Sequence, residues 1–512
     1  MVKFLTAEEA VAQINDNDTL ATSGFVSNGF AEVLAQALEK RFLETGKPSN
    51  LTLVYSAGQV GVNHFAHEGM LKRVIGGHWN LAPDLGKLAT EEKIEAYNLP
   101  QGTICHMFRD IAAGKIGTLT HVGLKTFVDP DIDGGAINNK AKAQKNAVEK
   151  LVINGKEQLL YKAFPINVCL LRGTTADEKG NISLEKEGVT LDTGSIAQAT
   201  KCSGGKVIVQ VERVVKAGTL DPRLVKIPGV YVDTVVVVPP AENMPEADAS
   251  MSPACNGEIR IPTDAIPALP MSERKIIARR AAMELQPNAI VNLGIGMPEA
   301  VAVVANEEGI GDYMTLTVEA GPVGGIPAGG GLFGLSINPD IILDEPYQFD
   351  FYDGGGLDLA FLGLAECDEK GNINVSKMGP RITGCGGFIN ITQNAKRLFF
   401  CGTFTTKGLK VGVEDGKLKI IQEGAKDKFL HMVDHVTFSG DFANSVGQPV
   451  MYITERAVFE LRKDGLYLTE VAPGIDIEKD IFAHMAFKPK MDGEPKLMDA
   501  RIFREEPMGL GK

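Results

Sequence analysis

The segment Thr174-Thr-Ala-Asp-Glu-Lys-Gly-Asn-Ile-Ser183 recurs in the second half of the chain as Leu364-Ala-Glu-Cys-Asp-Glu-Lys-Gly-Asn-Ile-Asn374. Two hairpin turns that use Gly and Asn for positive φ could share these residues by convergence. A second echo argues for a repeat, because Ser195-Ile-Ala-Gln-Ala-Thr200 resembles Phe388-Ile-Asn-Ile-Thr-Gln393, and each precedes an apolar run typical of a strand. The sequence therefore predicts two related α/β domains fused end to end.

The boundary between these halves is predicted from a Pro-rich stretch. Val230-Tyr-Val-Asp-Thr-Val-Val-Val-Val238 is typical of a buried strand, and seven prolines follow between Pro239 and Pro270. Ser272 is placed to cap a new helix over residues 273–284. We expect an N-terminal domain, an interdomain linker and a C-terminal domain over residues 1–240, 241–270 and 271–512.

The composition is that of a globular α/β enzyme with more than one domain. The 512 residues carry a formal net charge of -13, which argues against a binder of nucleic acid, since that needs clustered cations. The seven cysteines are scattered without Cys-x-x-Cys spacing, so we expect reduced thiols. The N-terminus turns acidic before a signal-peptide core forms, and no apolar run approaches a membrane span. We expect a cytoplasmic enzyme that binds neither nucleic acid nor membranes.

Glu319 is the most informative acid in the chain. It follows the β-rich run Tyr313-Met-Thr-Leu-Thr-Val318 and precedes the small residues Ala320-Gly-Pro-Val-Gly-Gly-Ile-Pro-Ala-Gly-Gly330. No Lys or Arg occurs between Arg280 and Lys370, so no neighbour in the sequence neutralises this carboxylate. An acid in this position either caps a turn or serves as an exposed nucleophile or base. The local sequence leaves both interpretations open.

Two glycine-rich loops are candidates for binding an anion. Asn292-Leu-Gly-Ile-Gly-Met-Pro-Glu299 permits close backbone approach, and its Pro298 is placed to begin a helix. It is not a dinucleotide fingerprint, because Glu299 replaces the third glycine. Gly384-Cys-Gly-Gly-Phe388 offers successive backbone N–H groups that could stabilise an oxyanion at a helix start. Either loop could equally be a packed turn.

Three other residue patterns were considered for chemistry. Gln101 follows Tyr97-Asn-Leu-Pro100 at a predicted helix start, where its amide either faces a ligand or caps the turn. His64 and His67 lack the spacing of the helical His-Glu-x-x-His site, so we predict no metal. Cys385 has no histidine nearby in the sequence, and its small size fits a packing role better than that of a nucleophile.

In combination these motifs resemble family I coenzyme A transferases, and most closely the acetate/propionate CoA-transferases. The resemblance covers nearly the whole chain, and it implies two open α/β domains of the CoA-transferase-like (NagB/RpiA-like) fold. The first domain would be similar to the α subunit, and the second to the β subunit, of two-chain relatives. The matching segments are the Glu319 region Thr317–Pro327, the two glycine loops, Asn98-Leu-Pro-Gln-Gly102, Tyr347-Gln-Phe-Asp-Phe-Tyr-Asp-Gly-Gly-Gly356 and Ala472-Pro-Gly-Ile-Asp-Ile477.

The resemblance implies specific roles for residues of this chain. Glu319 would be the nucleophile that becomes a γ-glutamyl-CoA thioester, and no cofactor would be bound permanently. Coenzyme A, short-chain acyl-CoA and short-chain carboxylates would be the substrates, and the protein would form a homo-oligomer, a dimer or a tetramer. The oxyanion site would be lined by the Gln101 amide and the N–H groups of Gly386 and Gly387. The residues expected near coenzyme A are Asn292, Gly294, Gly296 and Gly384.

One departure and two alternatives accompany this interpretation. Some relatives use a lysine downstream of the nucleophile to hold a CoA phosphate, and this chain has none between Glu319 and Lys370. A thioesterase would use the same glutamate with water as the final acceptor. A non-catalytic sensor of the same fold is the other alternative, although the acidic charge balance counts against a DNA-binding regulator. We expect Glu319 to be exposed in a cleft, so that Glu319→Ala abolishes transfer and the protein still folds.

Overall fold

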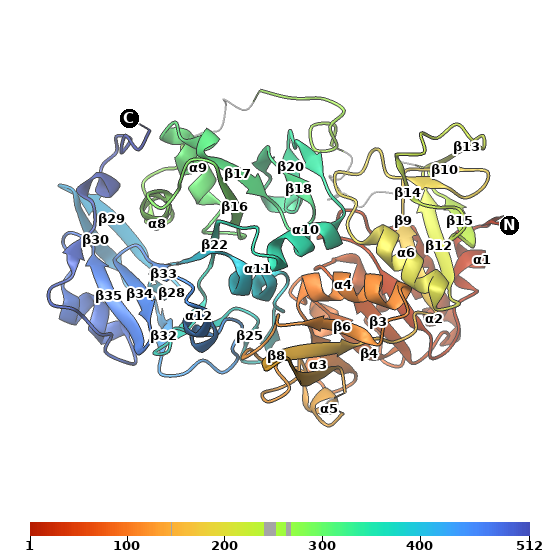
Figure 1. The fold of residues 1–512 in the computed structure, drawn as a ribbon, viewed down its shortest axis with the longest axis horizontal. Coiled ribbons are helices and arrows are strands. Elements are labelled where there is room, and N and C mark those ends of the chain that lie inside the picture. The colour runs from red at the N-terminus through yellow and green to blue at the C-terminus, as the bar shows by residue number, and fades with distance from the viewer. Residues whose placement is uncertain (145, 240–251, 263–267, 512) are drawn as a thin grey trace. The chain divides into compact units, whose positions relative to one another are not determined.

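A computed structural model describes residues 1–144, 146–239, 252–262 and 268–511 of the chain (Figure 1). It divides into two compact units, and the first break falls after Ile261, inside the stretch predicted as a linker. Residues 240–251 and 263–267 of that stretch lie outside the described residues. Unit 1 comprises Met1–Ile261, Val318–Asp350 and Gly379–Asn390, and unit 2 comprises Pro262–Thr317, Phe351–Met378 and Ile391–Lys512.

Unit 1 is built on a sheet of eight strands in which all neighbours are parallel. Strands buried on both faces are expected when helices cover a parallel sheet, and β9 and β3 are buried along their whole length. Across the sheet the strands are β1 (Lys3–Phe4), β15 (Thr234–Val237), β12 (Lys206–Val211), β9 (Val168–Arg172), β2 (Thr19–Thr22), β3 (Leu51–Tyr55), β4 (Leu71–Gly76) and β5 (Glu95–Asn98). Helices of this unit are α1 (Ala7–Val11), α2 (Glu32–Thr45), α3 (Pro83–Thr90), α4 (Gln101–Ala112), α5 (Asn139–Lys142) and α6 (Thr193–Cys202).

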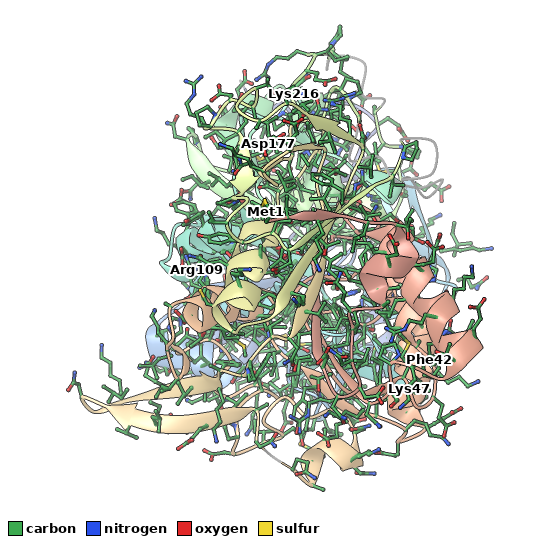
Figure 2. The ribbon with its side chains drawn as sticks, turned by 90° about the vertical axis from the view of Figure 1, so that its right-hand side faces the viewer. Met1, Phe42, Lys47, Arg109, Asp177 and Lys216 are labelled. Carbon is green, nitrogen blue, oxygen red and sulfur yellow. The ribbon has the colours of Figure 1, made fainter. Side chains whose placement is uncertain are left out.

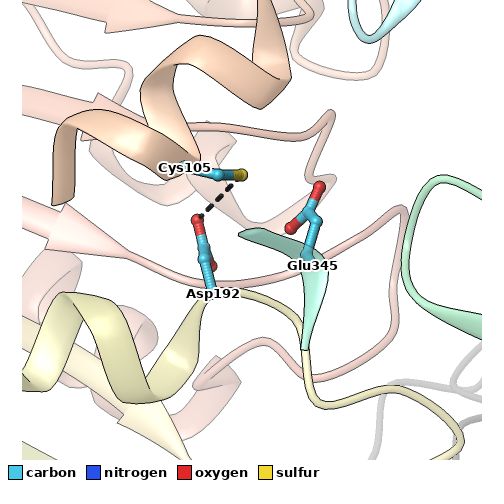
Figure 3. Close-up of side chains that lie close together, drawn as sticks. All are labelled: Cys105, Asp192 and Glu345. Carbon is cyan, nitrogen blue, oxygen red and sulfur yellow. Dashed lines mark hydrogen bonds between the residues drawn. The ribbon is translucent and has the colours of Figure 1, made fainter. Parts of the chain in front are cut away.

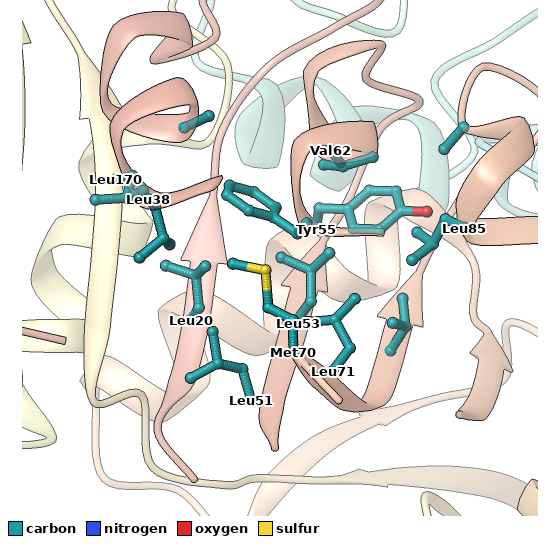
Figure 4. Packing of buried hydrophobic residues seen from close by; sticks show 14 of the residues in the cluster. Leu20, Leu38, Leu51, Leu53, Tyr55, Val62, Met70, Leu71, Leu85 and Leu170 are labelled. Carbon is teal, nitrogen blue, oxygen red and sulfur yellow. The ribbon is translucent and has the colours of Figure 1, made fainter. Parts of the chain in front are cut away.

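The core of unit 1 joins the sheet to its helices. Leu20 on β2 and Leu53 on β3 pack in one cluster with Leu38 on α2, and all three are fully buried (Figure 4). Burying such a side chain contributes roughly 1.5–3 kcal/mol relative to leaving it in water. This cluster fixes the strands whose carboxyl ends carry the loops described below.

Smaller elements extend unit 1. They are a three-stranded sheet of β6 (Gly117–Thr120), β8 (Lys156–Lys162) and β7 (Val148–Ile153), a four-stranded sheet of β13 (Arg213–Val215), β10 (Thr175–Asp177), β11 (Ile182–Ser183) and β14 (Val225–Ile227), and the pairs β18 (Pro322–Val323) with β21 (Ile341–Ile342) and β19 (Ile326–Pro327) with β20 (Ser336–Ile337). Their strand pairs are antiparallel except for the parallel pair β10 with β13.

Unit 2 contains a second, mixed sheet. Its first five strands are parallel, β34 and β35 are antiparallel additions, and β36 pairs parallel with β35. The strands follow one another as β17 (Met314–Thr317), β16 (Ala289–Leu293), β22 (Leu359–Gly363), β27 (Arg397–Cys401), β33 (Val450–Ile453), β34 (Ala457–Arg462), β35 (Gly465–Val471) and β36 (Lys496–Leu497). Its helices include α8 (Glu273–Ala282), α9 (Ala300–Glu307) and α12 (Gly440–Val446), whereas α10 (Glu345–Asp353) and α11 (Phe388–Asn394) begin in unit 1 and end in unit 2.

The two sheets share one topology over five parallel strands. In chain order these strands are β2, β3, β9, β12 and β15 in unit 1, and β16, β17, β22, β27 and β33 in unit 2. In both sheets the spatial order is fifth, fourth, third, first, second. The predicted pair of related α/β domains is therefore confirmed at the level of the fold.

Local predictions are met closely at several element boundaries. Ser272 caps α8, because its hydroxyl accepts a hydrogen bond from Lys275 N at 3.4 Å. Gln101 is the first residue of α4. The helix after the Asn292 loop begins at Ala300 and not at the predicted Pro298, because Gly296, with φ of +86°, sets a turn before helical geometry starts. No helix within the described ranges is both long and apolar enough to cross a membrane.

The repeated hexapeptide Asp-Glu-Lys-Gly-Asn-Ile, residues 177–182 and 368–373, forms the same turn in both units. Asp177 Oδ1 accepts hydrogen bonds from the backbone N–H groups of Lys179 at 2.8 Å and Asn181 at 3.0 Å. Asp368 Oδ1 accepts from the N–H groups two and four residues ahead, at 3.0 Å each, in the turn between β23 (Glu366–Asp368) and β24 (Ile373–Asn374). The glycine three residues after each aspartate has a φ of +83° or +78°, which suits glycine alone. Figure 2 labels Asp177 and, in the neighbouring segment, Lys216, which pairs with Glu178.

Each aspartate should stabilise its turn measurably. Asp177→Ala and Asp368→Ala each remove the two backbone hydrogen bonds within the turn and one from the following asparagine side chain, at 2.9 and 3.0 Å, and Asp368→Ala also removes the one from Val433 N at 3.3 Å. We expect either change to lower the free energy of unfolding by about 2 kcal/mol, measured by chemical denaturation. Lys179→Ala in the same turn is the control, with an expected change within about 0.5 kcal/mol. Wild-type stability of both aspartate variants would refute this account of the turn.

Candidate active site

Glu319 lies in the turn after β17, and its side chain is half-buried rather than fully exposed. Gly387 lies directly against its carboxylate. A Cβ atom built on Gly387 would come within 2.1 Å of Glu319 Oε2 and 3.0 Å of Phe349 Cζ. Any residue other than glycine at position 387 would therefore displace the carboxylate or the ring.

The surroundings of Glu319 disfavour its charged form. Burial raises the pKa of Glu319 to about 7, because little water reaches the carboxylate. Among the described residues, no Lys, Arg or His forms an ion pair with it, which agrees with the cation-free stretch of sequence. A carboxylate that is neither hydrated nor paired retains its reactivity as a nucleophile.

The glycine-rich loop 384–388 is held in place by Asn98, at the end of β5. Asn98 Oδ1 accepts a hydrogen bond from Cys385 N at 2.9 Å. Its Nδ2 donates to the carbonyl oxygens of Gly76 at 2.8 Å and Gly77 at 2.6 Å, at the end of β4. One buried amide thus joins two strand ends to a loop from the second half of the chain.

Gly384 packs against His78. Its φ is +81°, and a Cβ atom there would lie 2.7 Å from His78 Cα, so close backbone approach requires glycine. His78 Nδ1 is buried without a hydrogen-bond partner among the described residues, and burial lowers the pKa of His78 to about 4, so the ring is neutral at pH 7. Cys385 is buried and burial raises the pKa of its thiol, which fits the packing role expected from the sequence. The contact of Gly384 with coenzyme A stays a prediction.

The predicted oxyanion donors lie at the start of α4 and in the glycine-rich loop 384–388. Gln101 N donates to Gly386 O at 2.9 Å, which ties the start of α4 to the glycine loop. Gly386 N donates to Gly77 O at 2.7 Å, so this N–H is already used. No hydrogen bond joins Gly387 N–H to another described residue. The Gln101 side chain donates from Nε2 to Oε1 of Glu345 at 2.5 Å.

Two further buried carboxyl groups, those of Glu345 and Asp192, lie close to the Gln101 side chain or to each other. No pattern in the sequence marked either of them. Asp192, just before α6, accepts hydrogen bonds from the hydroxyls of Ser23 at 2.7 Å and Ser56 at 2.6 Å. Figure 3 shows Cys105 Sγ facing Asp192, with Glu345 opposite. Glu345 begins a helix directly before a proline, a place where acids commonly act as caps, so the sequence carried no catalytic signal for it.

The donor atoms of Cys105, Asp192 and Glu345 lie within 4.8 Å of one another, a spacing that would admit a metal ion. However, both Asp192 oxygens already accept hydroxyl hydrogens, and burial raises the pKa of the Cys105 thiol well above its ordinary value. A metal needs deprotonated ligands with free lone pairs. The chemistry of these groups therefore fits a proton-sharing network better, and the sequence-based expectation of no metal stays a prediction.

In unit 2, the predicted CoA loop follows β16. Asn292 Nδ2 donates to Thr317 O at 3.2 Å and to Tyr352 Oη at 3.3 Å, so its amide braces β16 against β17. Gly294 N donates to Phe361 O at 2.8 Å, which holds the loop close to β22. These contacts account for Asn292 and Gly294 structurally, and their approach to coenzyme A stays a prediction.

A cation contacts this loop that the sequence analysis did not single out. Arg274, on α8, donates from Nη2 to Gly296 O at 3.0 Å and lies 3.4 Å from Glu299 Oε2. Its Nε is buried without a hydrogen-bond partner among the described residues. Arg274 was missed because it precedes the loop in the chain, and only the fold brings helix and loop together.

Comparison with known proteins identifies the class of enzyme that has this fold. Residues 4–238 match the coenzyme A transferase family. The chain is 44% identical to the caffeate CoA-transferase of Acetobacterium woodii, over 100% of this chain and 99% of the relative. It is 41% identical to the acetate CoA-transferase YdiF of Escherichia coli (strain K12), over 99% and 96%. The YdiF thioester complex with CoA from E. coli O157:H7 has a TM-score of 0.93 at 41% identity, over 99% and 97%. The chain belongs to the family I coenzyme A transferases.

The pKa of Glu319 predicts the acid limb of the pH profile. A nucleophilic carboxylate must be ionised, and the ionised fraction rises as pH increases through the pKa of about 7. We expect kcat/KM for the acyl-CoA substrate to rise about tenfold per pH unit below this pKa and to level off above it. A transfer assay over a pH series measures the limb. A midpoint near the ordinary glutamate value of about 4.3 would contradict a buried, desolvated Glu319.

The contact of Gly387 with Glu319 predicts the effect of one added methyl group. Gly387→Ala must move the carboxylate, and a misplacement of about 1 Å typically costs about 100-fold in rate. We expect this loss in kcat with a melting temperature close to wild type. Gly86→Ala, where a Cβ on α3 meets nothing within 4 Å, is the matched control. Full activity of Gly387→Ala would show that the carboxylate works elsewhere.

Proposed function

We propose that this enzyme transfers coenzyme A between short-chain acyl-CoA, such as acetyl-CoA or propionyl-CoA, and short-chain carboxylates. It works by a ping-pong mechanism in which Glu319 carries coenzyme A as a γ-glutamyl thioester. The observation that carries this proposal is the half-buried, cation-free Glu319 carboxylate against Gly387, beside a loop with an unused backbone N–H. A relative at 41% identity has been solved as a thioester complex with CoA, which supports the same intermediate here.

The reaction is balanced without ATP or redox chemistry. A Glu319 carboxylate oxygen attacks the acyl-CoA carbonyl carbon, and CoA thiolate leaves to give a mixed anhydride. The thiolate then attacks the glutamyl carbonyl carbon, the first carboxylate departs and the glutamyl-CoA thioester remains. A second carboxylate attacks that thioester, which releases CoA thiolate and forms a new mixed anhydride. The thiolate then attacks the acyl carbonyl carbon of this anhydride, so that a new acyl-CoA forms and the Glu319 carboxylate leaves.

Each addition creates an oxyanion that needs hydrogen-bond donors. The Gln101 amide and Gly387 N–H are the donors best placed for it, since Gly386 N–H is engaged with Gly77 O. One preorganised donor is typically worth about 3 kcal/mol of barrier. The small residues that follow Glu319 leave space for the acyl group, and poor access of water protects the anhydride from hydrolysis.

We also propose a role for the unit 2 loop in holding coenzyme A. Asn292, Gly294 and Gly296 would approach the pantetheine arm through backbone groups. Arg274 would supply a positive charge for a CoA phosphate, which replaces the downstream lysine that this chain lacks. Its contact with Gly296 O shows that it reaches the loop.

Mass spectrometry of the protein after incubation with propionyl-CoA tests the covalent step. We expect a CoA adduct, formed with loss of water, on the peptide that contains Glu319, and its removal by hydroxylamine, which cleaves thioesters. Glu319→Ala should show neither adduct nor transfer and should keep the wild-type melting temperature. Glu258→Gln, which changes an exposed glutamate of unit 1, is the control and should form the adduct.

Two results would contradict the proposal. Transfer by Glu319→Ala at a wild-type rate would remove the nucleophile from the mechanism. Continuous release of free CoA from acyl-CoA without an added carboxylate would make water the acceptor and the enzyme a thioesterase.

A further inference from the structure

Glu345 contacts the amide that is expected to bind the oxyanion. Its side chain is fully buried, and its Oε1 accepts the hydrogen bond from Gln101 Nε2 at 2.5 Å. Among the described residues, Glu345 is the one hydrogen-bond partner of Gln101 Nε2, so the second amide hydrogen is left for a ligand. Glu345 Oε2 accepts no hydrogen bond of ordinary length from a described residue. Burying a carboxylate oxygen with no donor is costly, and protonation removes the part of that cost that comes from the buried charge.

Hydrogen bonds from Gln101 and Cys105 lower the pKa of Glu345, whereas the two carboxyl groups that face it favour its neutral form. They are the carboxyl groups of Asp192, before α6, and Glu319, after β17, with the Cys105 thiol on α4 between Asp192 and Glu345. Burial and these two acids raise the pKa of Glu345 well above its ordinary value. Burial raises the pKa of Asp192 as well, but its hydrogen bonds from Ser56 and Ser23 lower it, so Asp192 is the acid of the pair whose carboxylate has hydroxyl donors.

The cations of the neighbouring helix are engaged elsewhere. Arg109 on α4, labelled in Figure 2, forms a two-pronged ion pair with Asp350, toward the other end of α10. His106 Nε2 lies 3.2 Å from the same carboxylate and also contacts Pro346 O. Both of these side chains therefore contact groups other than Glu345.

We propose that Glu345 is a positioning residue that acts as a neutral carboxylic acid behind Gln101. Its carbonyl oxygen Oε1 holds one N–H of the Gln101 amide, which aims the other N–H at the carbonyl oxygen that becomes charged when Glu319 attacks. The proton on Oε2 faces Cys105 and Asp192. This inference rests on the proposed function, because it assigns Glu345 to the same oxyanion.

Charge explains why an acid, and not a carboxylate, suits this position. An ionised Glu345 would place a negative charge directly behind the developing oxyanion and near ionised Glu319, in surroundings of low dielectric constant. Both repulsions would raise the barrier. A neutral acid keeps the hydrogen bond to Gln101 and removes the repulsion, so Asp192 takes the charge farther from the reaction.

Substitutions at two positions separate this role from simple packing. Gln101→Ala should lower kcat by about 100- to 1000-fold, as expected for loss of one oxyanion donor. Glu345→Asp withdraws the acid from Gln101 and should lower kcat by about 10- to 100-fold with little change in KM. The double variant should be no slower than Gln101→Ala alone, because Glu345 acts only through that amide. Glu345→Gln is neutral and of equal length, so its loss in kcat should be at least about tenfold smaller than that of Glu345→Asp.

Infrared difference spectroscopy reports the proton directly. At pH 7 the wild type should show the carbonyl stretching band of a protonated carboxyl group. This band should be absent from Glu345→Gln and present in Glu319→Gln. The proposal is overturned if the band persists in Glu345→Gln, or if kcat of Glu345→Gln is as low as that of Glu345→Asp. It is also overturned if the losses in kcat of Gln101→Ala and Glu345→Asp multiply in the double variant. Stoichiometric zinc in the purified wild type that is absent from Glu345→Gln would also overturn it, since a metal would then hold Glu345 ionised.

Failure of this inference can be told apart from failure of the proposed function. If the wild type forms no glutamyl-CoA adduct, the proposed function is refuted whatever the Glu345 variants do. If the adduct forms at Glu319 and the variants behave otherwise than stated, only the role of Glu345 is refuted.

Discussion

The Asn98 side chain is the contact on which the candidate site depends most. Its amide accepts from Cys385 N and donates to the carbonyl oxygens at the end of β4, so three segments distant in sequence share one buried group. The position of Gly387 depends on this contact, because the glycine-rich loop that contains Gly387 is held at Cys385. The position of Gln101 depends on it as well, since Gln101 lies three residues after Asn98 and its backbone N–H donates to Gly386 O. Hydrogen bonds of a buried polar group rigidify only when every donor and acceptor is used, and Asn98 meets that condition.

A second constraint is the exclusion of positive charge from the reactive carboxylate. Burial raises the pKa of Glu319, and no Lys, Arg or His in the described part of the chain forms an ion pair with it that would lower this pKa again. Asp192 accepts hydrogen bonds from two hydroxyl groups, and we propose that the neighbouring Glu345 is neutral, so neither acid depends on a counter-ion. Positive charge is kept for the loop of unit 2, where Arg274 contacts Gly296 O. Among the described residues, no cation pairs with Glu319, the proposed nucleophile, whereas one cation contacts the loop that we propose to hold coenzyme A.

The internal repeat explains the scaffold but not the chemistry. Both units place five parallel strands in one order and repeat the Asp-Glu-Lys-Gly-Asn turn with the same hydrogen bonds. After β17 the chain presents Glu319, whereas after the corresponding β3 it presents Ser56, Ala57 and Gly58. Ser56 binds Asp192 and so supports the proton-sharing network. One copy of the strand exit therefore carries Glu319, the proposed nucleophile, and the other carries a serine that binds Asp192, as is common when function resides in loops on a repeated fold.

The sequence by itself determined the repeat and the strand and helix starts such as Ala289–Leu293 and Ser272, and it made Glu319 a candidate, because these depend on local propensity, capping and motif order. It also indicated Gln101 and the glycine loop as partners through family resemblance. Only the tertiary structure decided that Val318–Asp350 and Gly379–Asn390 pack with the first half, that Gly386 N–H is occupied, and that Glu345 lies behind Gln101. The physical reason is that burial and hydrogen-bond saturation are properties of groups brought together from distant parts of the chain. No local pattern of residues encodes which N–H remains free or which of two buried acids keeps its proton.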